Sequence, residues 1–179
     1  MSRAFVDEAS ADSRDEDAPE FKIPLPPGAR NYVTPEGAER LYSELKTLEA
    51  TERPDLAAEI LRLSRDPTNS DALATARRRL ARLDRRIEYL ARMAGLAEVV
   101  NRPAGGYDRV RFGARVTVRY GDGATSTFRI VGVDESDPVA GLVGWTAPLA
   151  RALMGRAPGE NSVVLLPGGE KTVTVLAVE

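Results

Sequence analysis

Residues 71–97 read DALATARRRLARLDRRIEYLARMAGLA and carry the most regular apolar spacing in the chain. The apolar residues recur in alternating steps of three and four, at Leu73, Ala76, Leu80, Leu83, Ile87, Leu90, Ala94 and Ala97. This spacing keeps a narrow stripe on one face of a helix and is typical of a coiled coil. It predicts a helix of about 25 residues, roughly 37 Å long, that begins near Ser70 or Asp71.

A partner helix is predicted on the N-terminal side. Thr34 is a helix N-cap candidate, and Pro35 suits the first helical position. Pro54 is expected to kink this helix or to divide it. The polar segment 64–70 predicts a turn, so the two helices should form an antiparallel coiled-coil hairpin that projects as an arm. The apolar residues that define the partner helix are Leu41, Leu45, Leu48, Leu56, Ile60 and Leu63.

The spacing changes to that of strands after residues 101–106, which form a linker by composition. Residues 115–120 alternate apolar and polar side chains, and residues 125–131 return after a Gly-Asp-Gly turn, which indicates a hairpin. We expect a small antiparallel sheet with one helix, an α+β domain over residues 107–179. The remaining predicted elements are a strand at 142–145, a short helix at 148–154, and a final hairpin of strands 163–166 and 172–178.

The N-terminal lead differs in composition from the rest of the chain. Residues 1–20 carry seven carboxylates against two arginines, a net charge of −5, whereas the whole chain carries −2. Residues 1–31, which end in a proline-rich stretch, are therefore expected to form a disordered tail. A solubilising tail is the plain interpretation, and a regulatory arm is the alternative. The hairpin is then assigned to residues 32–100.

Composition excludes several classes of site. The chain has no cysteine and no histidine, which removes disulfides, thiol nucleophiles, Ser-His-Asp triads and histidine-ligated metals. The apolar runs are much shorter than the ~18 residues that a membrane span requires, and no signal-peptide core is present. We expect a cytoplasmic protein without a membrane partner.

Three groups of residues could carry a function. Asp66 and Asp71 flank the predicted hairpin turn, and a carboxylate at the end of an arm could deliver Mg²⁺ to a remote site. Both could equally serve as turn and helix caps. The second helix carries seven arginines against three acidic residues over residues 71–92, a net charge of +4 that suits phosphate contacts. Ion pairing with the first helix is the alternative. Trp145, in the segment Trp145-Thr146-Ala147-Pro148, is either a core residue or a docking residue.

The chain resembles the bacterial transcript-cleavage factors of the GreA/GreB family, more closely GreB. The resemblance covers residues 32–179 and rests on the order and spacing of short segments. These segments are Thr34-Pro35-Glu36-Gly37, Glu52-Arg53-Pro54, Arg79-Leu80, Asp84-Arg85-Arg86, Tyr89-Leu90, Phe112-Gly113-Ala114, Phe128-Arg129-Ile130-Val131-Gly132 with Asp134-Glu135, Pro148-Leu149-Ala150-Arg151-Ala152-Leu153, and Pro167-Gly168-Gly169-Glu170.

The resemblance implies a mode of action. Members of this family dock an FKBP-like C-terminal domain at the rim of the RNA polymerase secondary channel and insert the coiled coil. Acidic tip residues help to hold a second Mg²⁺ in the polymerase active site, and the polymerase hydrolyses the nascent RNA at its backtracked 3′ end. The factor has no enzymatic activity of its own, and we expect a monomer. The basic flank implied here is Arg78, Arg79 and Arg82, in contact with RNA or the channel.

The chain departs from the family pattern in two places, the hairpin tip and the docking segment. The family tip is Asp-x-x-Glu-Asn, and here Asp66 keeps the first carboxylate while Asn69 replaces the glutamate. Asp71 could substitute only if the loop folds differently. In the docking segment, the family's Asp-Ser-Pro is replaced by Thr146-Ala147-Pro148. The sequence therefore predicts an elongation factor whose cleavage stimulation is weak or lost.

Two alternatives remain from the sequence. One is a coiled coil that binds nucleic acid directly, without RNA polymerase, through its arginines. The acidic total charge and the lack of a reader motif count against it. The other is an inactive peptidyl-prolyl isomerase, or a scaffold, that uses the α+β domain alone.

Overall fold

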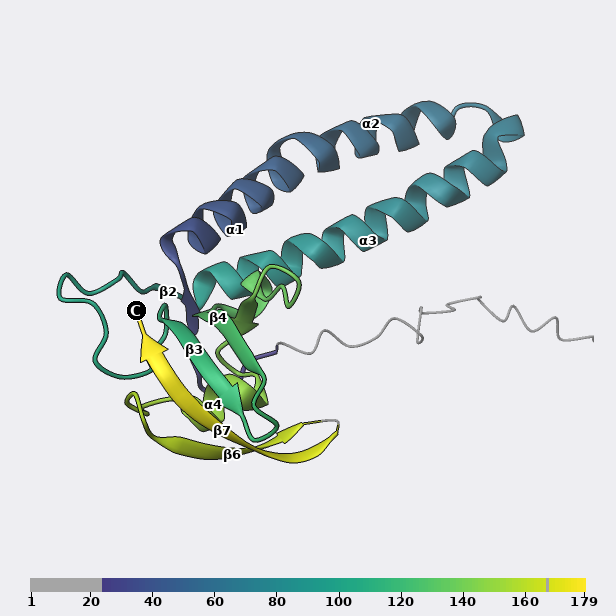
Figure 1. The fold of residues 1–179 in the computed structure, drawn as a ribbon. Coiled ribbons are helices and arrows are strands. Elements are labelled where there is room, and N and C mark those ends of the chain that lie inside the picture. Colours follow the sequence, from purple (N-terminus) through teal and green to yellow (C-terminus); the bar gives the residue numbers. More distant parts are fainter. Residues whose placement is uncertain (1–23, 167) are drawn as a thin grey trace, which may run out of the picture.

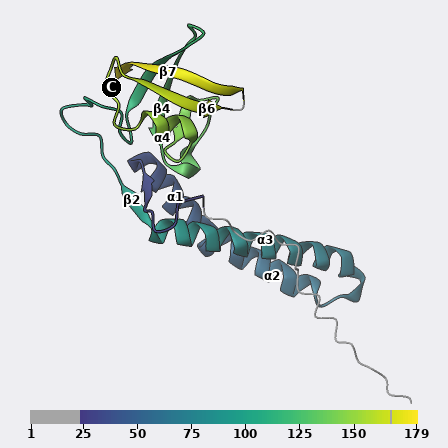
Figure 2. The same ribbon diagram turned by 90° about the horizontal axis from the view of Figure 1, so that it is seen from below.

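The computed structural model describes residues 24–166 and 168–179, and it shows a long helical hairpin that extends from a sheet domain (Figures 1 and 2). Most of the predicted tail, residues 1–23, lies outside the described residues. Regular structure starts before the expected first helix, because strand β1 (Asn31–Val33) precedes Thr34. None of the helices in the described part of the chain is long and apolar enough to cross a membrane.

Helix α1 (Pro35–Thr47) begins as the sequence predicts. The Thr34 hydroxyl oxygen accepts a hydrogen bond from the Gly37 amide at 3.0 Å, and Pro35 occupies the first helical position. The cap satisfies one of the amides that have no partner inside the helix. The start of the arm is therefore set by local chemistry.

The predicted interruption at Pro54 is confirmed. A π-helical turn, η1 (Leu48–Glu52), separates α1 from helix α2 (Arg53–Leu63). Pro54 has no amide hydrogen for the carbonyl four residues earlier, and a wider turn accommodates the lost hydrogen bond. The first half of the hairpin is thus two helical segments that follow one another directly, and the ribbon bends where they meet (Figure 1).

A 3₁₀ turn, η2 (Pro67–Asn69), leads into helix α3 (Ser70–Gly95), which starts where the sequence predicts. Ala76, Leu83 and Leu90 of the predicted stripe are buried. The prediction was wrong at the end of the stripe. The helix ends at Gly95, so Ala97 is not helical, and Met93, which the stripe omitted, is 0% exposed.

The hairpin has two apolar clusters along its length. The cluster nearer the tip is Leu56, Ala76 and Leu83, and the cluster at the base is Leu41, Leu90 and Met93. Charged pairs flank them, with Arg53 Nε 2.7 Å from Asp84 Oδ1 and Arg86 Nε 2.8 Å from Glu44 Oε1. Fully burying one such aliphatic side chain stabilises the fold by about 1.5–3 kcal/mol. With three buried side chains in each cluster, a single apolar stripe is enough to hold two helices together.

A two-stranded parallel sheet closes the base of the hairpin, which the sequence analysis did not predict. β1 pairs with β2 (Ala97–Val99), with Asn31 opposite Ala97. Asn31 is 1% exposed, and its side-chain amide donates to the Met93 carbonyl at 3.0 Å. The chain entering α1 is therefore fixed to the chain leaving α3.

The C-terminal domain contains a five-stranded sheet in the order β5-β4-β3-β7-β6. Both predicted hairpins, β3–β4 and β6–β7, are confirmed. Val116, Val118, Val173 and Val175 alternate toward one face, where helix α4 (Pro148–Leu153) covers them with Ala150 and Leu153. The strands are β3 (Arg115–Tyr120), β4 (Thr125–Val131), β5 (Leu142–Gly144), β6 (Asn161–Leu166) and β7 (Gly169–Val178).

The prediction of an antiparallel sheet was wrong at one edge, because β5 pairs parallel to β4. The connection passes through a 3₁₀ turn, η3 (Val133–Glu135), and turns back so that β5 runs beside the last three residues of β4, with Leu142 opposite Arg129. A three-residue strand has no pattern that reveals its direction, so only the connection decides it. The sheet is mixed, and η3 is carried to the edge that faces the hairpin.

Candidate functional site

The hairpin tip holds the three residues that the sequence singled out there. Asp66 caps η2 and is fully exposed, Asn69 ends η2, and Asp71 lies in the first turn of α3. Asp66 Oδ1 accepts hydrogen bonds from the Thr68 amide at 2.9 Å and the Thr68 hydroxyl at 2.8 Å. Among the described residues nothing bonds the second oxygen, Oδ2, which leaves it open to solvent.

The two hydrogen bonds from Thr68 also favour the ionised form of Asp66. The Thr68 amide first, and the Thr68 hydroxyl second, hold the pKa of Asp66 below its ordinary value. Both donors favour the ionised carboxylate over the protonated form. Asp66 is therefore a fixed, solvent-facing negative charge at neutral pH.

Asn69 and Asp71 do not extend this charge into a cluster. Asn69 is half-buried and makes no side-chain cap for α3. Asp71 lines a groove between α2 and α3, of about 380 Å³, together with Glu59 and Arg79. Within residues 24–166 and 168–179 no group of three or more acidic side chains could hold a metal ion. Asp66 can thus contribute one ligand to an ion held elsewhere, but the described tip does not form a magnesium site by itself.

Several arginines lie on α3 between the tip and Arg86, and one of them, Arg79, lines the groove between α2 and α3. We call Arg78, Arg79, Arg82 and Arg85 the arginine face; Arg78, Arg82 and Arg85 follow a spacing of four and three residues that places them on one side of the helix. Arg78, Arg79 and Arg82 are exposed and Arg85 is half-buried. The only side-chain contact that the described residues give this face is Arg78 Nη2 to Thr75 Oγ1 at 3.2 Å.

Closer to the base, the arginines are neutralised. Arg86 forms a two-pronged pair with Glu44, at 2.8 and 2.9 Å, and its guanidinium lies 5.6 Å from the Tyr89 ring centre. The hydrogen bonds to Glu44 raise the pKa of Arg86. Ion pairing with the first helix, the alternative raised by the sequence, therefore holds for Arg86, whereas no residue in the described part of the chain forms an ion pair with the arginine face.

The predicted docking segment lies at the opposite end of the molecule, between β5 and α4. Trp145 is half-buried, contacts the sheet core, and meets Tyr32 of β1 edge to face with ring centres 5.6 Å apart. Its indole nitrogen has no hydrogen-bond partner among the described residues. Thr146 and Ala147 are half-buried, and Pro148 is exposed as the first residue of α4. Trp145 thus belongs in part to the core and in part to the domain junction.

A buried carboxylate joins the hairpin to the sheet domain. Glu135 of η3 is 8% exposed, and its Oε1 accepts from the amides of Thr34 at 2.9 Å and Gly132 at 3.1 Å. Its Oε2 accepts from the Thr34 hydroxyl, and Arg40 lies 3.6 Å away. A Cβ at Gly37 would stand 2.2 Å from the Glu135 carboxyl carbon, so only glycine leaves room for this carboxylate.

Two weaker contacts support the same junction. The Tyr89 hydroxyl donates to Asp134 Oδ1 at 2.6 Å, and Arg129 Nη2 lies 3.9 Å from Glu36 Oε2. Burial, and then the hydrogen bond to Asp134, raise the pKa of Tyr89. The sequence analysis gave these residues no role, although Asp134-Glu135 lies in a matched segment. The Gly-x-x-Glu pattern that follows a strand could have indicated a capping role for Glu135. It could not have predicted that Glu135 also bonds to Thr34.

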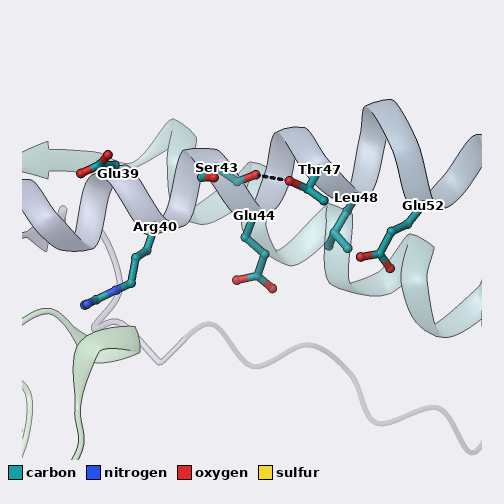
Figure 3. Close-up of a pocket in the computed structure, with 7 residues that line it drawn as sticks. All are labelled: Glu39, Arg40, Ser43, Glu44, Thr47, Leu48 and Glu52. Carbon is teal, nitrogen blue, oxygen red and sulfur yellow. Dashed lines mark hydrogen bonds between the residues drawn. The ribbon is translucent and has the colours of Figure 1, made fainter.

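A groove with a volume of about 540 Å³ lies on the flank of α1 and η1 (Figure 3). Arg40, Glu44, Leu48 and Glu52 extend to the same side of the helix, and the Thr47 hydroxyl donates to the Ser43 carbonyl at 2.9 Å. Glu44 is already paired with Arg86. The groove therefore offers a surface but no pair of groups suited to acid–base or nucleophilic chemistry.

Comparisons with known proteins match both parts of this arrangement. The family model described as "Transcription elongation factor, N-terminal" matches residues 31–99, and the model "Transcription elongation factor, GreA/GreB, C-term" matches residues 104–179. Transcription elongation factor GreB of Neisseria meningitidis serogroup A is 35% identical over 156 residues, which are 84% of this chain and 94% of that protein.

Transcription elongation factor GreA of Anaeromyxobacter is 36% identical over 149 residues, 82% of this chain and 90% of that protein. Among solved structures, that of GreA factor homolog 1 of Thermus thermophilus is 22% identical and covers 84% of this chain and 99% of its own, with a TM-score of 0.37.

Proposed function

The chain belongs to the GreA/GreB family of transcription elongation factors, and from this premise we propose that it binds bacterial RNA polymerase at the secondary channel and directs its hairpin tip toward the active site. The observation that carries the proposal is the separation of the two ends. The hairpin turn between α2 and α3 lies at the end of the arm away from the sheet domain that would dock outside (Figure 2). Asp66 of that turn is exposed, and so are Arg78, Arg79 and Arg82 of α3, which have no ion pair within the described residues. A helix of 26 residues spans about 39 Å, enough to reach into a narrow channel.

In this proposal the hairpin packs as an antiparallel coiled coil and the sheet domain is FKBP-like. The apolar contacts of Leu56, Ala76 and Leu83 support coiled-coil packing, since they come from a three- and four-residue spacing. Residues 101–106 act as the linker between the two units. Trp145, Thr146, Ala147 and Pro148 form the docking segment, without the carboxylate that the family carries there.

The tip would act on the polymerase and not as an enzyme. Asp66 would offer its open oxygen to a Mg²⁺ ion held mainly by polymerase carboxylates; when bound, such an ion polarises a phosphodiester and activates water. Asn69 supplies no charge at the second position, so cleavage stimulation is weak or absent. Arg78, Arg79 and Arg82 contact the RNA 3′ end or the channel wall. The factor acts as a cytoplasmic monomer without catalysis of its own.

A backtracked elongation complex tests the proposal. The complex is incubated with Mg²⁺, with and without the protein, and shortening of the labelled RNA is followed. We expect binding with little shortening, and an increase of about tenfold or more for Asn69→Glu, since tenfold requires only ~1.4 kcal/mol of barrier. Asn69→Gln is the matched control and should change nothing. Vigorous shortening that survives Asn69→Ala but is abolished by Asp66→Ala would show that one carboxylate suffices.

A second candidate function is favoured by the unpaired arginine face. If the arm binds nucleic acid without polymerase, the free protein should bind duplex DNA or RNA with an affinity that falls steeply with salt. Co-purification with RNA polymerase, together with no binding to free duplex at 0.15 M salt, would exclude it.

A further inference from the structure

Strand β6 forms one edge of the five-stranded sheet, and within the described residues no segment pairs with its outer side (Figure 1). Its six residues read NSVVLL, without a charge or a proline. Its pairing with β7 runs without a register shift, so no bulge turns the edge aside. Sheet proteins ordinarily protect an edge with charged side chains, proline, a bulge or a very short strand. β6 has none of these protections, so its backbone is available to a further strand.

The backbone groups that face outward from β6 follow from its pairing with β7. The Val175 amide donates to the Glu160 carbonyl at 3.0 Å, just before β6 begins, so these two residues face one another across a hydrogen bond. Hydrogen-bonded positions alternate along an antiparallel pair, so Ser162 and Val164 also direct their amides and carbonyls toward β7. The strand residues that direct theirs toward the free edge are Asn161, Val163 and Leu165.

Two of these outward residues also present apolar side chains to solvent. Val163 is 61% exposed and Leu165 is 72% exposed, whereas Val164 between them is 1% exposed and belongs to the sheet core. Because side chains alternate between the two faces of a strand, Val163 and Leu165 lie on the same outer face. A strand that joined this edge would bond to the backbone and cover both side chains at once.

A second copy of β6 matches this edge in charge and in side chains. Antiparallel pairing with Val163 opposite Leu165 of the second copy lets each such pair exchange both of its backbone hydrogen bonds. The same register places apolar side chains opposite one another. Because β6 carries no charge, the pairing buries no ion and opposes no like charges, whereas a charged partner would find no opposite charge on this strand.

The opposite edge of the sheet would limit such pairing to two chains. β5 has only three residues, and Asp137 forms an isolated bridge with Leu142 of that strand. The β5 edge is therefore short and partly occupied, unlike that of β6. A two-fold pairing uses the β6 edges of both chains and leaves no free β6 edge for a third.

We propose that two copies of the chain pair reversibly and antiparallel along β6, which joins their sheets into one. At about 3.3 Å per residue the strand is only about 20 Å long, so the contact buries less than the roughly 800 Å² per partner of a standard interface. The pairing is therefore weak, with a dissociation constant on the order of 100 µM. The single chain remains the form that acts in dilute solution, in agreement with the proposed function, on which this inference does not depend.

Sedimentation equilibrium of the full chain tests the association. Between about 20 µM and about 1 mM, we expect the average mass to rise from near 19.4 kDa toward twice that value. Val163→Lys should abolish the rise, because it places a charge on the pairing edge of each chain. Val139→Lys, the same substitution at a 99% exposed residue outside the strands, is the matched control and should associate like the unsubstituted chain.

A second variant and amide hydrogen exchange locate the contact. Leu165→Lys should also abolish the association, and both lysine variants should keep the urea midpoint of the unsubstituted chain, because both side chains are mostly exposed. In the unsubstituted chain, exchange at the Val163 and Leu165 amides should be about twofold or more slower at about 1 mM than at about 20 µM. The Val164 amide, which already faces β7, should change little.

Three results would overturn the inference. One is a mass that stays at 19.4 kDa at the highest concentration. Another is association that both lysine variants leave unchanged, or that slows exchange at neither edge amide, since the contact would then lie elsewhere. The third is growth beyond two copies, which would show an open assembly. The elongation assay uses dilute protein, so its outcome bears only on the proposed function.

Discussion

Removing the carboxylate of Glu135 should loosen the attachment of the hairpin to the sheet domain. The carboxylate accepts three hydrogen bonds in a buried position, two from Thr34 and one from Gly132. Its contact with Arg40 adds little, because that side chain is 66% exposed. Breaking a buried charged network by removing one partner costs about 3–5 kcal/mol, since the donors left behind lose both protein and water partners.

We therefore expect Glu135→Ala to lower the free energy of unfolding by about 3–5 kcal/mol. Urea unfolding followed by the fluorescence of Trp145, which contacts Tyr32 at the junction, measures the loss. Glu36→Gln is the matched control: Glu36 is 63% exposed and 3.9 Å from Arg129, so its loss should cost no more than about 1 kcal/mol.

A double-mutant cycle with Gly37 isolates the contact. Gly37→Ala alone would normally stabilise a helix by up to about 1 kcal/mol, but here its Cβ would displace the Glu135 carboxylate from its hydrogen bonds. It should destabilise the native chain and become neutral or stabilising in the Glu135→Ala background. A loss below 1 kcal/mol for Glu135→Ala, or additive effects in the cycle, would refute the assignment.

Two further outcomes follow from the arm. The Asp66 carboxyl should titrate below its ordinary pKa in an NMR pH series, and Thr68→Val, which removes one of its two donors, should move that pKa upward. Because the pKa of Asp66 is lower in the folded chain, its hydrogen bonds with Thr68 stabilise the fold at pH values above the unfolded pKa. That stabilisation is lost as the pH falls through the folded pKa. An Asp66 pKa that is unchanged or raised would contradict the geometry of the tip. Arg86→Ala should lower the free energy of unfolding by at most about 1 kcal/mol because its pair with Glu44 is half-exposed, whereas Arg82→Ala should leave urea stability unchanged. A larger loss for Arg82→Ala than for Arg86→Ala would show that the arginine face is structural.

Local chemistry made the arm predictable from sequence. Thr34 and Pro35 set its start, Pro54 its interruption, and the stripe through Leu83 and Leu90 its packing, because each rule acts within a few residues. The end of α3 was missed, since Gly95 and the following strand depend on Asn31, a partner sixty-two residues away from Met93.

The junction was not predictable in the same way. Glu135 looks like any acidic residue of a loop, and only the fold brings it to Thr34, 101 residues earlier. The direction of β5 depends likewise on the path of the chain through η3. At the tip, the sequence placed Asp66 and Asn69 on the turn, but the open oxygen of Asp66 follows from its bonds to Thr68. The sequence also did not show which arginines of α3 are paired. Only the structure shows that Glu44 pairs with Arg86 and Asp84 with Arg53, and that neither pairs with the arginine face.

The entry of the tip into RNA polymerase is the central claim, and a tethered iron chelate measures it most directly. The chelate is attached at Arg65→Cys, an exposed turn residue next to Asp66 in a chain without native cysteine, and hydroxyl-radical cuts in the polymerase are mapped. We predict cuts centred on the carboxylates that hold the catalytic Mg²⁺, and none there with the chelate at Val139→Cys on the sheet domain. Cuts confined to the outer surface, or the same cuts from both positions, would contradict the account.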